Sequence, residues 1–157
     1  MPLVIPASSA PAARAWLFAQ ITAALTPDPL SPTSSLLVCY DDPGPNQPDD
    51  IVSIGKVQRT LSTNSMVGSG GAGYLEERYT VEIEIDVFRG GDSAQVAYTR
   101  AAHLADGVVA VVRSDLSLGG AVVSARPVSD VTEVAWDDEH RGQHATCTVD
   151  VTCYQRI

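Results

Sequence analysis

The sequence predicts an α+β domain in which an antiparallel sheet of four to five strands carries two helices on one face. Three observations support this prediction. Residues 79–87 alternate between apolar and polar side chains, which is typical of a strand with one buried and one solvated face. In residues 93–114 the apolar side chains recur every three or four positions, as in a helix with one buried stripe. A one-sided strand followed by a one-sided helix implies that helices pack against one face of a sheet.

The two sides of the 79–87 strand differ in chemistry. Its apolar side consists of Tyr79, Val81, Ile83, Ile85 and Val87. Its polar side consists of Thr80, Glu82, Glu84 and Asp86. We therefore expect the open face of the sheet to be wet and acidic.

The elements before this strand follow from local signals. Residues 10–25 form the first predicted helix, because Pro11 suits a first turn and the prolines after residue 26 end the pattern. The apolar run 36–40 is short and flanked by polar residues, which favours a strand. Residues 51–60 alternate again and predict a further strand, although both of its sides carry apolar residues.

The last third of the chain predicts more strands. Residues 121–136 form one long strand, or two strands interrupted at Pro127, a residue that suits an edge strand or a bulge. Residues 137–142 are a charged hairpin connection, and residues 145–154 alternate clearly. The expected order is helix, strand, strand, strand, helix, strand, strand.

The 157 residues are expected to form one domain with two irregular segments. Residues 1–9 are predicted to be an extended N-terminal arm, and residues 61–76 a flexible glycine-rich loop. Loops of this length are usually functional or disordered. The side chains proposed to contact a partner from this loop are Asn64, Met66, Val67, Tyr74 and Leu75.

The net charge of −9 argues against a surface that grips nucleic acid, because such a surface needs clustered basic side chains. Lys56 is the single lysine, and the arginines are scattered along the chain. Residues 1–6 lack the basic and apolar regions of a signal peptide, and no apolar run approaches the ~20 residues that span a bilayer. We expect the protein to remain in a cytoplasm unless a larger assembly carries it out.

The three cysteines are expected to be thiols of a reducing compartment. Cys147 and Cys153 lie in one predicted strand, about 20 Å apart, and cannot bridge each other. Cys39 remains the one possible disulfide partner of either, and the sequence leaves this pairing open.

No pattern in the sequence predicts a catalytic residue, a cofactor or a metal. Residues 68–73 lack the ending of a phosphate-binding loop, and His103 is accompanied by no nucleophile motif. The acids Asp41, Asp42, Asp49 and Asp50 lack calcium-loop spacing and predict a solvated acidic loop. The remaining mixed cluster consists of Asp137, Asp138, Glu139, His140 and His144. It predicts a polar hairpin tip, with a metal site as the alternative.

Taken together, the elements resemble the tail-terminator family of long-tailed bacteriophages and the wider head–tail joining proteins of similar fold. Four features carry the resemblance: the early helix 10–25, the glycine-rich loop 62–73, the strand 77–87 that leads into the helix 93–114, and the closing strand that ends Val-Asp-Val-Thr-Cys-Tyr. The resemblance covers most of the chain and concerns architecture, so it transfers no individual functional residue.

The resemblance implies a non-enzymatic virion protein that forms a homo-oligomeric ring, of six copies in that family. Such a ring caps the tail tube, stops its growth and offers a surface for head attachment. The implied partners are further copies of the chain, the tail tube protein and the head–tail connector or stopper protein. The implied location is the tail or neck of the virion, after assembly in the host cytoplasm, with no membrane contact.

DNA is expected to pass through the lumen of such a ring without specific binding. The acids at 82, 84 and 86 and at 137–139 fit this expectation, because a basic lumen would retard the phosphates. Two alternatives remain from the sequence. One is another head–tail connector component or a tail tube subunit, and the other is a small metal- or ligand-binding module that uses His140 and His144.

Overall fold

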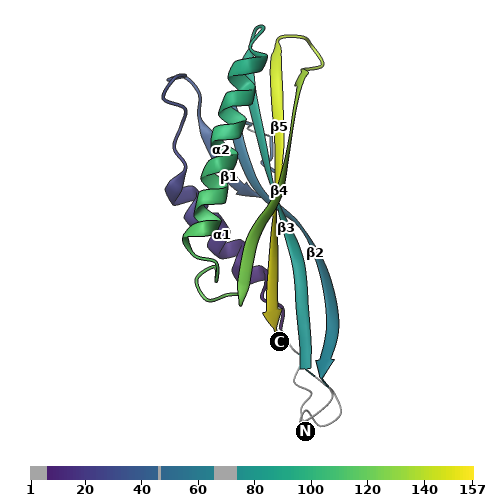
Figure 1. Cartoon of the computed structure of the whole chain (residues 1–157). Helices are drawn as coiled ribbons and strands as arrows, with labels where there is room; N and C mark the ends of the chain where they lie inside the picture. Colours follow the sequence, from purple (N-terminus) through teal and green to yellow (C-terminus); the bar gives the residue numbers. More distant parts are fainter. Residues whose placement is uncertain (1–6, 46, 66–73) are drawn as a thin grey trace.

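Five strands form one mixed sheet in the order β1-β2-β3-β5-β4, and two helices cover one face of it (Figure 1). This computed structural model describes residues 7–45, 47–65 and 74–157. The elements are α1 (Ala10–Ala24), β1 (Leu36–Tyr40), β2 (Asp50–Ser65), β3 (Tyr74–Gly90), α2 (Ala94–Ser114), β4 (Ser124–Trp136) and β5 (Gly142–Arg156). The α+β class and the order of the elements are as the sequence predicts.

β3 is the central strand and has the two faces that its alternation predicts. It pairs with β2 on one side and along nearly its whole length with β5 on the other, in both cases antiparallel. The apolar side chains buried from this strand are Tyr79, Val81, Ile83, Ile85 and Val87. On the opposite face Glu84 is exposed, and Glu82 and Asp86 are half-buried, so that the open face of the sheet is acidic.

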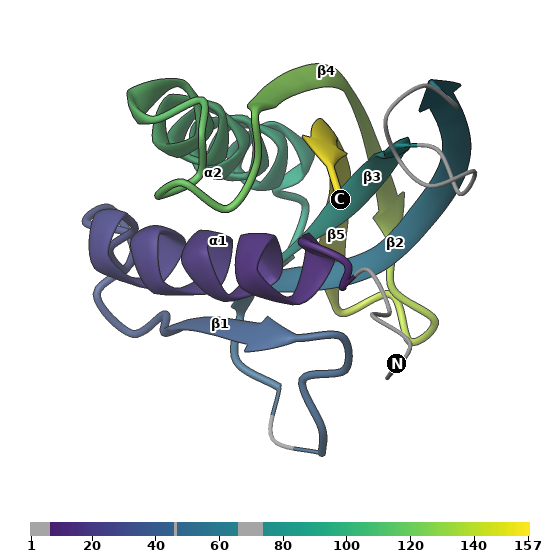
Figure 2. The same cartoon turned by 90° about the horizontal axis from the view of Figure 1, so that it is seen from below.

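The two helices lie side by side on the buried face of the sheet (Figure 2). α1 buries Ala13, Leu17 and Ile21. α2 buries a longer stripe that consists of Ala97, Arg100, Ala101, Leu104, Ala105, Val108, Val111 and Val112. Burying one Leu or Val side chain stabilises the fold by roughly 1.5–3 kcal/mol, so these stripes hold the helices on the sheet. Neither helix is long and apolar enough to cross a membrane, and this finding applies to the described part of the chain.

The sheet is mixed because β1 pairs parallel with β2, from Leu36 opposite Asp50 to Tyr40 opposite Ile54. The prediction of a wholly antiparallel sheet is wrong at this one pair. The connection 41–49 carries the chain back past β1, so that β2 starts beside the beginning of β1 and runs in the same direction. The residue pattern of a short apolar strand such as 36–40 does not show whether the neighbouring strand runs parallel or antiparallel to it.

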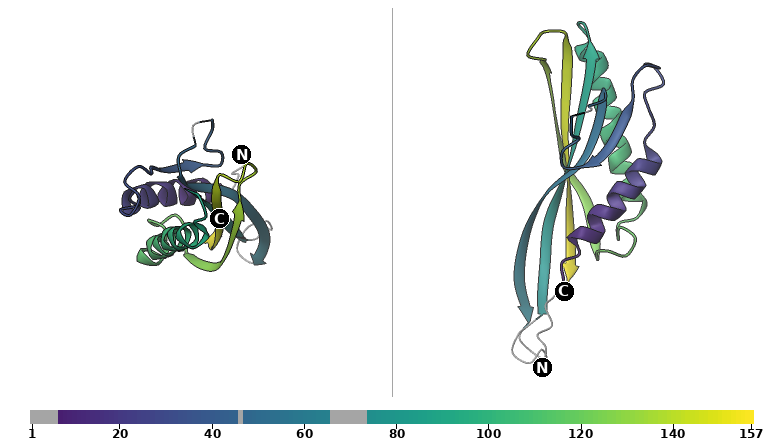
Figure 3. Two further views of the ribbon diagram at one scale, coloured as in Figure 1. Left: turned by 90° about the horizontal axis from the view of Figure 1, so that it is seen from above. Right: turned by 180° about the vertical axis from the view of Figure 1, so that it is seen from behind.

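The hairpin of β2 and β3 is longer than the sequence predicts. Residues 61–65 and 74–76, assigned to the loop 61–76, belong to strands, with Leu61 paired to Glu77 and Thr63 to Leu75. These positions lack alternation because the segment extends past the helices, as Figure 3 shows, and neither side meets the core. Residues 66–73, and residues 1–6 of the predicted arm, lie outside the described residues.

β4 is one long strand at the edge of the sheet, which decides between the two interpretations of residues 121–136. A bulge lies between Pro127 and Ser129, where Pro127 faces Val151 and Ser129 faces Asp150. Proline cannot donate to a strand ladder, so its place on an edge strand beside a bulge follows from its chemistry. The charged hairpin between β4 and β5 is also as predicted.

All three cysteines are free thiols. Cys147 and Cys153 are buried on β5, whereas Cys39 is half-buried on β1. β2 and β3 separate these strands in the sheet, which excludes a disulfide with Cys39. Burial raises the pKa of the Cys153 thiol to about 12.

Gly142 and Gly90 face each other across β3 and β5 and offer a matched pair of substitutions. A Cβ at Gly142 would collide with the carbonyl oxygen of Arg89 and lie 2.8 Å from two ring carbons of Phe88. A Cβ at Gly90 would meet nothing within 4 Å. We expect Gly142→Ala to lower the free energy of unfolding by about 1–2 kcal/mol, and Gly90→Ala to change it by a few tenths. Urea denaturation of both variants tests this, and equal effects would contradict it.

Candidate functional site

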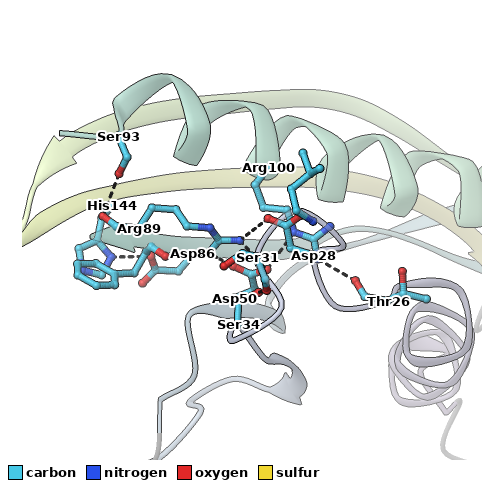
Figure 4. A network of polar contacts seen from close by, with 12 residues as sticks. Thr26, Asp28, Ser31, Ser34, Asp50, Asp86, Arg89, Ser93, Arg100 and His144 are labelled. Carbon is cyan, nitrogen blue, oxygen red and sulfur yellow. Dashed lines mark hydrogen bonds and ion pairs between the residues drawn. The ribbon is translucent and has the colours of Figure 1, made fainter. Parts of the chain in front are cut away.

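Four buried charged side chains meet where the start of β2 and the end of β3 face the first half of α2 (Figure 4). They are Asp28, Asp50, Arg89 and Arg100. Asp50, which is fully buried, receives hydrogen bonds from Arg89 Nη1 at 2.6 Å and from Arg100 Nε at 2.9 Å. Arg89 Nη2 also donates to Asp28 Oδ2 at 2.8 Å. Arg100 Nη2 donates to the carbonyl oxygen of Thr26 at 2.7 Å.

The charges of this cluster balance, with two carboxylates against two guanidinium groups. Burial alone would raise the pKa of Asp28, but hydrogen bonds from Arg89 and from the Leu30 amide, with the nearby positive charges, hold it below its usual value. Burial alone would lower the pKa of Arg89. The hydrogen bonds to Asp50 and Asp28 outweigh this effect, so the pKa of Arg89 is raised above its usual value. Asp28 and Arg89 therefore keep their charges at neutral pH.

Both guanidinium groups of the cluster have a nitrogen without an acceptor among the described residues. Arg100 is 9% exposed, and its Nη1 donates to no described group, whereas its Nε and Nη2 are both engaged. Arg89 Nε also lacks a partner and is enclosed. Arg100 thus retains N–H groups that can donate to a further acceptor.

A pocket of about 470 Å³ opens beside the cluster, and Asp28, Arg89 and Arg100 are among the residues that line it. Its polar lining includes Arg89, Arg100 and His103, and its apolar lining includes Leu30 and Val96. Leu30 is 91% exposed and Val96 is 55% exposed, so both present apolar surface at the mouth of the pocket. The volume lies in the range of small-molecule sites, and the combination of apolar walls with few polar groups is typical of them.

A second buried acid ties β3 to the start of α1. Glu77, whose side chain is fully buried, receives hydrogen bonds from Ser9 N at 2.7 Å, Ser9 Oγ at 2.5 Å, Ser8 Oγ at 2.9 Å and Arg59 Nε at 2.6 Å. The first turn of α1 contains no acidic residue, so Glu77 supplies the negative charge that a helix N-terminus favours. Burial would raise the pKa of Glu77, but its hydrogen bonds from Ser9, Arg59 and Ser8 hold it below its usual value.

The acids of the 41–50 segment do not form one group. Asp41 pairs at the surface with Arg14 at 2.9 Å, and Asp42 accepts a hydrogen bond from the amide of Gly44. Asp50, by contrast, is buried in the charged cluster, so the prediction of a solvated acidic loop is wrong for this residue. A buried arginine pair from later in the chain compensates its charge, and no local pattern reveals that.

The two histidines of the β4–β5 region have separate contacts. The ring of His140 stacks on Trp136, with centroids 6.0 Å apart. His144 Nδ1 lies 2.8 Å from Asp86 Oδ1 on the open face of the sheet. Within the described ranges, no three His, Cys, Asp or Glu side chains are grouped as metal ligands. His103 instead lies at the pocket beside Arg100, a place that its sequence neighbours do not indicate.

Three of the five residues proposed for partner contact lie in strands, and the other two lie outside the described residues. Asn64 lies in β2, and Tyr74 and Leu75 open β3, so they belong to a paired hairpin. The carbonyl oxygen of Leu75 accepts a hydrogen bond from the amide of Ile157. Met66 and Val67 lie outside the described residues.

Comparison with known proteins adds no assignment to this geometry. No protein-family model matches the sequence, and no curated protein matches it.

Proposed function

We propose that this chain is a structural protein of a bacteriophage tail, a tail terminator that assembles into a ring, caps the tail tube and joins it to the head connector. The order of the seven elements, on which the resemblance to that family rests, is present in the fold. The proposal includes no catalytic step. Its partners are further copies of the chain, the tube protein and the connector or stopper protein.

The observation that carries the proposal is a sheet with two open strand edges on opposite sides. β4 forms one edge over Ser124–Trp136. The other edge is the part of β2 beyond Ile54, because β1 pairs with β2 only over Asp50–Ile54. An open strand edge is a template for pairing with another chain. Pairing of two different edges is a head-to-tail contact, and such a contact closes into a ring when the rotation allows it.

The two edges are also complementary in charge. The open part of β2 carries Lys56 and no acid, while its Arg59 is paired with Glu77 of β3. β4 carries Asp130 and Glu133 beside a single Arg126. Val131, which is 64% exposed, adds apolar surface to the β4 edge. Opposite charges on cross-strand neighbours stabilise a pair of strands and set its orientation.

In this proposal the acidic open face of the sheet lines the channel. Glu82 and Glu84 of β3 and Asp150 of β5 lie on that face. An acidic lining makes no attractive contact with DNA phosphates, so DNA passes without being held. The protruding β2–β3 hairpin is the element that reaches a tubular partner (Figure 1).

The first test is the mass of the purified protein by light scattering after gel filtration, with negative-stain imaging of the particles. We expect a ring in solution or on addition of tail tubes. Val131→Lys places a charge on the β4 edge and is expected to reduce assembly by about tenfold or more, because charged side chains protect strand edges. Val96→Lys is the matched control, since Val96 is also more than half exposed but lies on α2.

The proposal would be contradicted if the protein stays monomeric at high concentration and also fails to bind tail tubes. Equal assembly of the two lysine variants would remove the β4 edge as the contact. Binding to the ends of preformed tubes identifies a terminator, whereas growth into long tubes identifies a tube subunit.

A further inference from the structure

We propose that the pocket beside Arg100 is a binding site for a carboxylate that is attached to an apolar body. This site is independent of the ring contacts, because the pocket lies between α2 and residues 28–31 and neither strand edge lines it. The ligand's carboxylate accepts hydrogen bonds from the free N–H groups of Arg100, and its apolar body lies against Leu30 and Val96. The same chemistry occurs in a free monocarboxylic acid and in an acidic side chain flanked by apolar residues.

Arg100 is the group that selects an anion. Its Nε and Nη2 are held by Asp50 and by the Thr26 carbonyl, so the plane of the guanidinium is fixed before any ligand arrives. A fixed donor loses little conformational entropy on binding, and hydrogen bonds to a charged acceptor are the stronger kind. A further acceptor would add hydrogen bonds to a side chain that is nine-tenths buried and has N–H groups to spare.

The surrounding charges limit the ligand to one negative charge. Asp28 also lines the pocket, and Asp50 lies behind Arg100, so the four charges of the cluster sum to zero. A dianion such as a phosphate ester would lie beside the Asp28 carboxylate, and the balanced cluster offers no net positive charge to hold its second negative charge. A carboxylate carries one charge for the N–H groups of Arg100, with Gln95 and His103 at the pocket as further polar groups.

The apolar lining of the pocket selects acids that carry an apolar body. The mouth is bordered by Leu30 and Val96, whose exposure leaves apolar area that a ligand can cover. Burial of apolar area contributes roughly 25 cal/mol per Å², so acids without an apolar body bind weakly here. Acetate is therefore expected to bind far more weakly than a larger acid.

The experiment titrates the full chain with phenylbutyrate and follows the amide signals of α2 by NMR. Phenylbutanol and phenylbutylamine have the same apolar body without the carboxylate, and we expect them to bind at least about tenfold more weakly. Val96→Glu puts a negative charge at the mouth and is expected to weaken phenylbutyrate binding by a similar factor. Tyr98→Glu is the matched control, because Tyr98 is exposed on the same helix and does not line the pocket.

A second arm separates the two sources of the carboxylate. It compares a capped Leu-Leu-Glu peptide with its Leu-Leu-Gln analogue. Tighter binding of the Glu peptide than of phenylbutyrate assigns the site to a protein segment, and the reverse assigns it to a free acid. No shift with either acid, equal binding of the alcohol, or unchanged binding by Val96→Glu would each overturn the proposal. None of these outcomes depends on ring assembly.

Discussion

Asp50→Asn is expected to lower the free energy of unfolding by about 3–5 kcal/mol, the largest effect of any single substitution proposed for this chain. Asp50 is fully buried and pairs with two guanidinium groups that are themselves more than nine-tenths buried. Asparagine keeps the shape of the side chain but removes the charge. Arg89 then retains Asp28 alone, and Arg100 retains no carboxylate. The cost comes from the two buried cations that are left without compensation.

Urea denaturation followed by circular dichroism measures this effect. Asp138→Asn is the matched control, since it makes the same chemical change at an exposed position in the β4–β5 turn. Surface substitutions of this kind change stability by less than about 0.5 kcal/mol. A loss below about 1 kcal/mol for Asp50→Asn would show that the charged cluster is not a structural centre of the fold.

Glu77→Gln is expected to have the second largest effect, a loss of about 3 kcal/mol. The substitution removes the charge that faces Arg59 and the N-terminus of α1. It also turns one acceptor into a donor beside groups that all donate to Glu77. Because Arg59 is about one-third exposed, water compensates part of its charge, and the loss stays below that of Asp50→Asn.

The effect of Glu77→Gln depends on pH in a defined direction. The pKa of Glu77 in the folded protein lies below its ordinary value of 4.5. Its contribution to stability is therefore complete above pH 4.5 and is lost as the pH falls through the lower pKa of the folded state. The difference between the wild type and Glu77→Gln should be full at pH 7 and shrink below 4.5.

The control for this series is Glu84→Gln, an exposed position on the opposite face of the same strand. Its effect should be small at neutral pH. If the stability difference of Glu77→Gln stayed constant down to pH 3, the charge of Glu77 would not be the cause.

Periodicity was sufficient to predict most of this fold. The alternation of residues 79–87 and 145–154 and the helical stripe of 93–114 gave the buried faces correctly, because each of these elements packs one side against the core. Pro127 predicted an edge strand or a bulge, and β4 has both. The outer part of the β2–β3 hairpin was missed, since both of its sides are solvated and no alternation marks it.

The charged cluster and the pocket could not be predicted for a different reason. Asp28 and Arg89 are 61 residues apart, and Glu77 and Ser9 are 68 residues apart. Asp50 lies in an acid-rich stretch that has every local sign of a solvated loop. Its burial depends on the parallel pairing of β1 and β2, which places the start of β2 under α2, and the sequence does not record that pairing.

The thiols described above differ in reactivity as well as position. Cys147 and Cys153 are enclosed by the core, and burial also raises the pKa of both thiols, so reagents reach neither sulfur in the folded protein. Cys39 is half-buried at the margin of the sheet, 3.7 Å from the hydroxyl of Ser53. Alkylating reagents should therefore modify the folded protein at Cys39 alone. A single label can then be attached there without substituting any cysteine.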